Sequence, residues 1–192
     1  STHCISSAAS DVYKRQGQDG VYMPEYYYDK DNGRKVTKAG FVKDNRGLTY
    51  YLDEKGNKVL GLHEINGDLY YFRRGGAYKY TQLGDMWQDS INYIDGKIYY
   101  FGHDGRAIKN RFYQWGNYWY YFYADGSAAT GAVQINGQQL YFDKNHGRQV
   151  KGAFAPDGHY YDENSGELVT NQTRTIKGVT YHFDENGNAT KV

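Results

Sequence analysis

The chain has 192 residues, of which 18% are aromatic, and tyrosine alone occupies 23 positions. Leu, Ile, Val and Met are sparse, which predicts a thin, elongated architecture instead of an ordinary compact core. The formal net charge of +1 without a concentrated basic run predicts that the partner is neither a nucleic acid nor another polyanion, and no apolar stretch approaches the roughly 20 residues that span a bilayer.

Residues 1–16 read STHCISSAASDVYKRQ and share no pattern with the rest of the chain. We interpret them as a tag, a linker or a cloning-derived tail. They contain Cys4, and a single thiol in such a segment indicates neither a disulfide framework nor a catalytic nucleophile. Residues 17–192 are predicted to form one repeat domain.

A short unit recurs along residues 17–192, marked by one glycine before an aromatic triplet and another behind it. The glycines before the triplets are spaced by 20, 29, 20, 21, 21 and 20 residues. They are Gly47, Gly67, Gly96, Gly116, Gly137, Gly158 and Gly178. Many follow Asn or Asp, and such pairs between β-prone residues are the strongest short-range signal for a β-hairpin. The unit therefore predicts an all-β chain of about eight short hairpins that stack as a β-solenoid.

The spacing of 29 residues places an irregular insertion at residues 77–94. A degenerate hairpin is the preferred reading of this insertion, and an elbow between two solenoid halves or a binding loop are the alternatives.

The aromatic triplets divide their side chains between two faces, because side chains alternate along a strand. The triplets are 26–28, 50–52, 70–72, 99–101, 120–122, 140–142, 159–161 and 181–183. Leu occurs only at first or third positions, so these positions are predicted to pack between hairpins. Middle positions are Tyr or His, whose rings tolerate partial exposure, and this middle row is predicted to face a ligand.

Catalytic and metal-binding constellations are not found in the sequence. Asp29, Asp53, Asp143, Asp162 and Asp184 follow triplets and precede turns, where Asp is favoured because it bonds nearby backbone amides. The histidines lack ligand spacing, and the segment 29–33 resembles a calcium loop but lacks its distal Glu. We therefore predict no enzyme activity for this segment, no metal and no cofactor.

The unit from Ile135 to Gly152 resembles the cell-wall-binding and glucan-binding repeats of Gram-positive bacteria, whose fold is that of choline-binding repeats. Together with residues 110–131 and 164–171, it looks most like the glucan-binding domain V of glucansucrases. Two relatives are alternatives, namely choline-binding modules and the glycan-binding repeats of clostridial toxins, and a third alternative is a structural spacer or cell-wall tether that binds no sugar. The choline-binding alternative is weakened because its typical Gly-Trp pairs are absent, and Trp87, Trp115 and Trp119 are too few and too clustered to form cages along a solenoid.

The resemblance implies a non-catalytic module that binds an extracellular α-glucan, such as dextran or isomaltooligosaccharides, in several pockets between repeats. A stacking Tyr would pair there with polar residues, and Tyr141 with Gln149 and Lys151 matches this pattern best. The further residues that the resemblance implies as carbohydrate-binding are Tyr121, Tyr100, Lys109, Tyr71, Tyr51 and Tyr160. It also implies a monomer that is secreted or attached to the surface of a Gram-positive cell.

Overall fold

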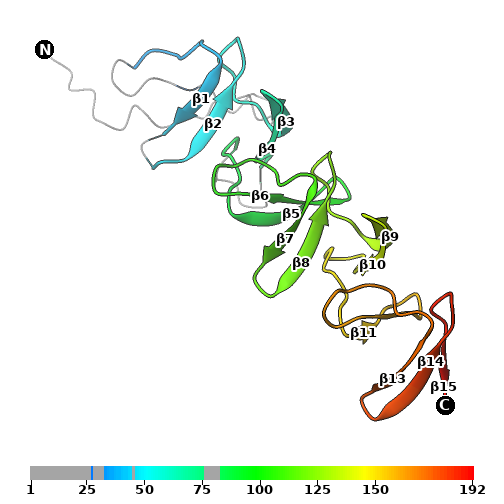
Figure 1. Ribbon diagram of the computed structural model, residues 1–192. Coiled ribbons are helices and arrows are strands. Elements are labelled where there is room, and N and C mark those ends of the chain that lie inside the picture. The colour runs from blue at the N-terminus through cyan, green and yellow to red at the C-terminus, as the bar shows by residue number, and fades with distance from the viewer. Residues whose placement is uncertain (1–26, 28–32, 45, 76–82) are drawn as a thin grey trace, which may run out of the picture. The chain divides into compact units, whose positions relative to one another are not determined.

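The computed structural model describes residue 27 and the ranges 33–44, 46–75 and 83–192 (Figure 1). Its regular elements are all strands, which confirms the predicted all-β repeat fold. The chain divides into two compact units, residues 1–90 with 101–107 and residues 91–100 with 108–192. The leader at 1–16 and the calcium-like segment around Asp31 lie outside the described residues.

Consecutive strands pair as antiparallel hairpins in both units. The strands of the first unit are β1 (Gly40–Lys43), β2 (Thr49–Leu52), β3 (Gly61–Ile65) and β4 (Asp68–Phe72). The hairpin of β5 (Ser90–Ile94) and β6 (Lys97–Phe101) lies mostly in the second unit. The remaining strands are β7 (Arg111–Trp115), β8 (Tyr118–Phe122), β9 (Gly131–Ile135), β10 (Gln138–Phe142), β11 (Ala153–Phe154), β12 (Tyr160–Tyr161), β13 (Gln172–Ile176), β14 (Val179–Phe183) and β15 (Ala189–Lys191).

The Asn-Gly pairs close the hairpins as the sequence predicts. In β9–β10, Ile135 pairs with Gln138 across a two-residue loop in which Asn136 has φ 52° and Gly137 has φ 84°. Two successive positive φ values define the type I′ turn, whose twist matches that of the flanking strands. Asn and Gly enter this left-handed region at the lowest cost, which explains why they recur at this point of the unit.

In four of the described repeats the second turn, which follows the aromatic triplet, is organised by the predicted Asp. The Asp143 carboxylate accepts hydrogen bonds from the backbone amides of Asn145 at 2.9 Å, His146 at 2.9 Å and Arg148 at 3.2 Å. The turn returns the chain to the third triplet residue, so that Phe142 forms a β-bridge with Gln149. Asp53, Asp162 and Asp184 bond their own turns in the same way, which confirms the structural reading of these carboxylates.

The hairpins stack through both faces of the aromatic triplet. As predicted, the third members that the structure describes are buried, at 0% exposure for Phe122 and Phe142. The middle residue of one hairpin packs against the first and third residues of the next. Within the second unit this rule joins Tyr100 to Tyr120 and Phe122, Tyr121 to Leu140 and Phe142, Tyr141 to Tyr161, and Tyr160 to Tyr181 and Phe183.

Backbone hydrogen bonds repeat the same link between neighbouring hairpins. In the second unit, Ala128 N donates to Ile98 O at 2.8 Å, Gln149 N to Trp119 O at 2.8 Å, and Leu168 N to Gln139 O at 2.9 Å. Each acceptor stands one residue before a triplet. The segment after the second turn therefore joins its own hairpin to the preceding one. We call the buried contact between the aromatic triplets of neighbouring hairpins the seam. A single hairpin cannot form such a seam, and solenoid repeats form it by stacking.

The longest unit has its extra residues between Phe72 and Met86. Phe72 bridges Met86 just as Leu52 bridges Lys58, although the intervening chain is longer. Ser90–Ile94 form β5, an ordinary strand that pairs in a hairpin. We predicted that the insertion extends to residue 94, and residues 90–94 do not belong to it. Residues 76–82 fall outside the described ranges, and the three readings of the insertion are not tested there.

Candidate functional site

Five of the seven described tyrosines in the predicted ligand-facing row are buried. Their exposures are 9% for Tyr27, 8% for Tyr71, 4% for Tyr100, 2% for Tyr141 and 6% for Tyr160. The prediction of half-exposed rings is wrong at these positions, because an inner hairpin of a stack has a neighbour on each face. Tyr51 and Tyr121 are half-buried as predicted, and His182 in the last hairpin is exposed.

Aromatic neighbours provide most of the cover. Trp87 lies 4.3 Å from Tyr71, Tyr113 lies 4.6 Å from Tyr100, and Tyr161 lies 5.7 Å from Tyr141, measured between ring centroids. Tyr160 has Phe154 at 5.2 Å in an edge-to-face arrangement. These distances are those of favourable aromatic pairs inside a core. The four rings thus stabilise the stack.

The polar pair Gln149 and Lys151 stands beside Trp119 and not beside an exposed Tyr141. The backbone amide of Gln149 bonds Trp119 O, and Lys151 Nζ lies 5.9 Å from the centre of the Trp119 ring. Trp119 is itself 38% exposed. Because residues 149 and 151 share one side of an extended segment, the amide and the ammonium both lie on the side of this indole.

The next repeat orients this polar pair. Lys151 Nζ donates to Asn164 O at 2.8 Å, and Gln149 Nε2 donates to Ser165 O at 3.4 Å. Gly166 lies directly beneath them, since a Cβ built there would come within 2.3 Å of Gln149 Nε2. Gly166 also has φ 74°, so both its conformation and its lack of a side chain are needed at this point.

Hairpin β7–β8 differs from the other hairpins by carrying three exposed aromatic residues near its tip. Trp115 is 40% exposed, Tyr118 45% and Trp119 38%. At the position of Trp115 the hairpins β3–β4, β5–β6 and β9–β10 carry Ile65, Ile94 and Ile135, all of which are buried. We call Trp115, Tyr118 and Trp119 the aromatic tip. The sequence carries this signal as a Trp-Gly-Asn-Tyr-Trp run, which our interpretation set aside when it considered only cages.

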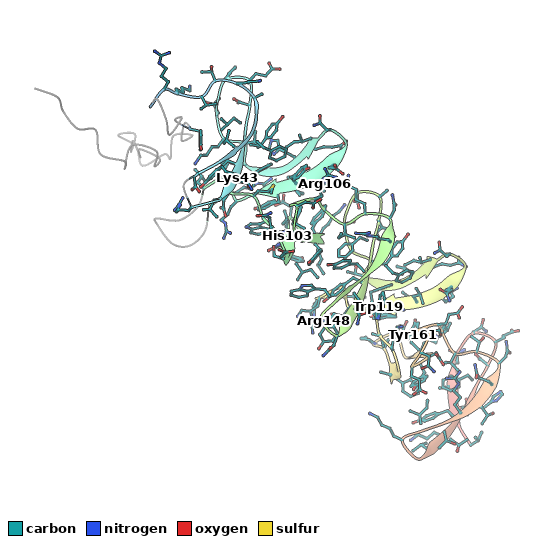
Figure 2. The ribbon with its side chains drawn as sticks, turned by 60° about the vertical axis from the view of Figure 1, so that its left-hand side comes forward. Lys43, His103, Arg106, Trp119, Arg148 and Tyr161 are labelled. Atoms are coloured by element: carbon teal, nitrogen blue, oxygen red, sulfur yellow. The ribbon has the colours of Figure 1, made fainter. Side chains whose placement is uncertain are left out.

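The aromatic tip has two faces, each with a basic side chain from the following repeat. Trp119 points to one face with Lys151, whereas Trp115 and Tyr118 pair across the strands and point to the other. The guanidinium of Arg148 lies over the Tyr118 ring at 4.1 Å, within the range of a cation–π contact. Figure 2 shows Trp119 and Arg148 at this hairpin.

The Asp143 carboxylate holds the second turn that carries these basic residues. Burial alone would raise the pKa of Asp143, but the backbone amides of His146, Arg148 and Asn145 hold it below its usual value. The carboxylate therefore stays ionised and keeps the turn in place at neutral pH. Among the described residues, no group of three or more His, Cys, Asp or Glu side chains could bind a metal ion.

Exposed aromatic rings beside an amide and an ammonium suit a sugar. A pyranose has an apolar C–H face that covers a flat ring, and hydroxyl groups at its rim that accept from N–H donors. Lys151 has three donors, and within the described part of the chain one of them is used on Asn164. The arrangement provides binding groups without a nucleophile or a paired acid and base.

Known repeat families match several parts of this chain. The choline-binding repeat matches residues 129–172, and the putative cell wall binding repeat matches residues 39–58, 110–128 and 174–189. The chain is built from choline-binding and cell wall binding repeats. This confirms the repeat type predicted from the sequence.

Two streptococcal enzymes contain similar sequence. Glucosyltransferase-S of Streptococcus mutans serotype c is 37% identical over 179 residues, which cover 90% of this chain and 11% of that protein. Glucosyltransferase-I of Streptococcus downei is 38% identical over 165 residues, covering 82% and 10%. The chain thus spans about a tenth of the length of these relatives. The matched segment is a repeat module and not a catalytic region, as predicted.

Solved structures of cell wall binding repeats have the same fold. Choline binding protein F of Streptococcus pneumoniae aligns with a TM-score of 0.68 at 27% identity, covering 87% of this chain and 54% of that one. The autolysin LytC of the same species aligns with a TM-score of 0.64 at 22% identity, covering 86% and 36%, and supports the fold alone. Within the described ranges, no helix has the length and apolar character needed to cross a membrane.

Proposed function

We propose that this chain is a module that binds extracellular α-glucan, with its principal site at Trp119, Gln149 and Lys151. The observation that carries the proposal is the 38% exposed Trp119 ring beside the polar pair that the glucan-binding resemblance singles out. A glucose unit would lie on the indole while the Lys151 ammonium and the Gln149 amide bind its hydroxyls. The similarity to streptococcal glucosyltransferases supports a glucan as the polymer.

Among the other predicted residues, Tyr51 and Tyr121 are proposed as secondary contacts, because they keep part of the ring exposed. Lys109 occupies the position of Lys151 in an earlier repeat, but Ala107 replaces the glutamine there, so it is proposed as a weaker site. Tyr71, Tyr100, Tyr141 and Tyr160 are assigned to packing. A single shallow site of this kind binds with an affinity of about millimolar, and several sites on one chain raise the avidity for a polymer.

The charges at the aromatic tip favour a neutral sugar over choline at this site. A quaternary ammonium needs aromatic walls that are free of competing cations. Lys151 already places an ammonium 5.9 Å from the Trp119 ring centre, and Arg148 lies on Tyr118 in the same hairpin. Two fixed positive charges would repel choline. We further propose that the module acts as a monomer outside the cell or at the surface of a Gram-positive bacterium, as expected of cell wall binding repeats.

Affinity electrophoresis of the 192-residue chain in gels containing dextran tests the proposal. The chain should be retarded, and Trp119→Ala should weaken the apparent affinity about tenfold, because the stacking surface is lost while the buried seam is untouched. Tyr93→Ala is the matched control, since Tyr93 is a 70% exposed tyrosine on β5 that should not affect retardation. Unretarded mobility of the folded chain in dextran, or equal retardation of the Trp119 variant, contradicts the proposal. Displacement by choline and not by isomaltooligosaccharides would assign the site to choline instead.

A further inference from the structure

We infer that the second face of the aromatic tip, formed by Trp115, Tyr118 and Arg148, is a separate site for an acidic polysaccharide. This inference does not depend on the glucan proposal, because strand alternation directs Trp119 to the opposite face. Trp115 and Tyr118 stand directly opposite each other in the register of β7 and β8, with exposures of 40% and 45%. Both rings keep exposed surface for a sugar, although Arg148 lies over Tyr118 at 4.1 Å and Tyr100 lies 6.2 Å from Trp115.

Arg148 supplies the charge that distinguishes this face. Four other arginines form ion pairs with carboxylates, namely Arg46, Arg73, Arg106 and Arg174. Arg148 makes no side-chain hydrogen bond or ion pair with any described residue, and its buried Nε has no acceptor. Its guanidinium is instead held over Tyr118 at 4.1 Å. A planar guanidinium fixed on a ring directs its remaining donors outward, in the geometry that binds a carboxylate or a phosphate with two hydrogen bonds.

The chain as a whole is nearly neutral, from which we predicted no polyanionic partner, but the segment around Arg148 is locally basic. Residues 144–151 read KNHGRQVK, with three permanent cations and no carboxylate. The preceding Asp143 is engaged by the amides of its own turn. The corresponding second turns of other repeats contain acidic residues, as in Asp53-Glu54 and Asp162-Glu163. Charge complementarity therefore selects an anionic sugar polymer for this face, and the two aromatic rings select a sugar over a simple anion.

The site is tested with an acidic and a neutral oligosaccharide of equal length, and with an anionic polymer that lacks sugar rings. Binding of an oligogalacturonide, a neutral galactose oligosaccharide and a poly(glycerol phosphate) to the full chain is measured by isothermal titration at two salt concentrations. The oligogalacturonide should bind about tenfold more tightly than the neutral oligosaccharide, and its affinity should fall as salt rises. Binding of the poly(glycerol phosphate) alone would contradict a site for an acidic sugar.

Three variants separate this face from the glucan site. Arg148→Gln should weaken binding of the oligogalacturonide about tenfold and leave retardation in dextran within about twofold. Trp119→Ala should do the reverse, and Tyr93→Ala should change neither. Arg148→Lys, which keeps the charge but loses the planar fork, should be intermediate. Circular dichroism confirms that each variant is folded. Equal binding of charged and neutral probes, binding by neither anionic probe, or an unaffected Arg148→Gln variant overturns the inference.

Discussion

Single residues of the repeat take different roles according to whether a neighbouring hairpin covers them. Trp119 and Tyr141 both belong to a second strand of a hairpin, yet the first is 38% exposed and the second 2% exposed. Trp119 lies near the tip, where the following repeat contacts it through Gln149 and Lys151, whereas Tyr141 lies in the seam with Tyr161 and Ala155. Distance from the seam, and not residue type, decides which aromatic ring is available to a ligand.

The seam role of Tyr141 predicts that its replacement affects stability. Tyr141→Ala leaves a cavity next to Tyr161 and should lower the free energy of unfolding by about 3 kcal/mol, as for other large aromatic residues in cores. Urea denaturation followed by fluorescence measures this loss. Tyr93→Ala, at an exposed site, should change stability by less than about 0.5 kcal/mol. A stable Tyr141→Ala variant that no longer binds dextran would return Tyr141 to the sugar site.

The sequence alone was sufficient to predict the repeat, the turn residues and the buried third members of the triplets. Asn136-Gly137 and Asp143 specify local backbone geometry, which depends on few neighbours and is therefore readable from the chain. The middle row was misassigned because its burial depends on the next repeat. The pairing of Lys151 with Trp119 joins residues that are 32 positions apart, and no local pattern contains that contact.

At the level of the elements, the second turn of each repeat supports the preceding one. Gly166 fits against Gln149 and Lys151, and Gly187 fits against Leu168 in the equivalent place of the next repeat. Gly147 likewise lies against Ala128, with the built Cβ at 3.3 Å. At Gly147, Gly166 and Gly187 the glycine behind the triplet thus serves contact between hairpins as well as the turn itself. The glycines of the hairpin tips have only the conformational role.

Two glycine substitutions separate these roles. Gly137→Ala has open space around its new Cβ. The only cost is the left-handed backbone conformation at φ 84°, which should lower the free energy of unfolding by about 1 kcal/mol. Gly166→Ala has a similar φ of 74° but also displaces the Gln149 side chain, so it should lose about 1 kcal/mol more and weaken retardation in dextran. Urea midpoints and dextran gels measure the two effects. Equal behaviour of both variants would show that Gln149 is not held by this contact.

At the level of the whole molecule, the two compact units carry different charge networks. The first unit buries Asp85 at 4% exposure against Arg73, with carboxylate oxygens at 3.0 and 3.2 Å from the guanidinium. Burial raises the pKa of Asp85 despite this partner. Both units also contain turn aspartates whose pKa is lowered by hydrogen bonds, Asp44 and Asp53 in the first unit and Asp125, Asp143, Asp162 and Asp184 in the second. The Ser127 hydroxyl and Lys97 bring the pKa of Asp125 to about 2, against the cost of desolvation.

These opposite shifts predict how each unit responds to acid. A carboxylate whose folded pKa is depressed contributes stability above its unfolded pKa of about 4 and loses that contribution as the pH falls through the folded value. Asp125, Asp143, Asp162 and Asp184 all have lowered pKa values, so the second unit should lose stability between about pH 4 and pH 2. For Asp85 the sign is reversed, because protonation removes a buried charge, which partly offsets acid destabilisation in the first unit.

Fluorescence distinguishes the units in this experiment, since Trp87 lies in the first unit and Trp115 and Trp119 lie in the second. Chains that retain only Trp87, or only the other two, are unfolded in urea at pH 7, 4 and 2.5. The midpoint reported by Trp115 and Trp119 should fall more steeply with acid than that reported by Trp87. Asp125→Asn should lower the second midpoint at pH 7 but have little effect near pH 2, where the wild-type carboxylate is itself becoming protonated. Parallel midpoints in both units at every pH would contradict the assignment of acid sensitivity to the turn aspartates.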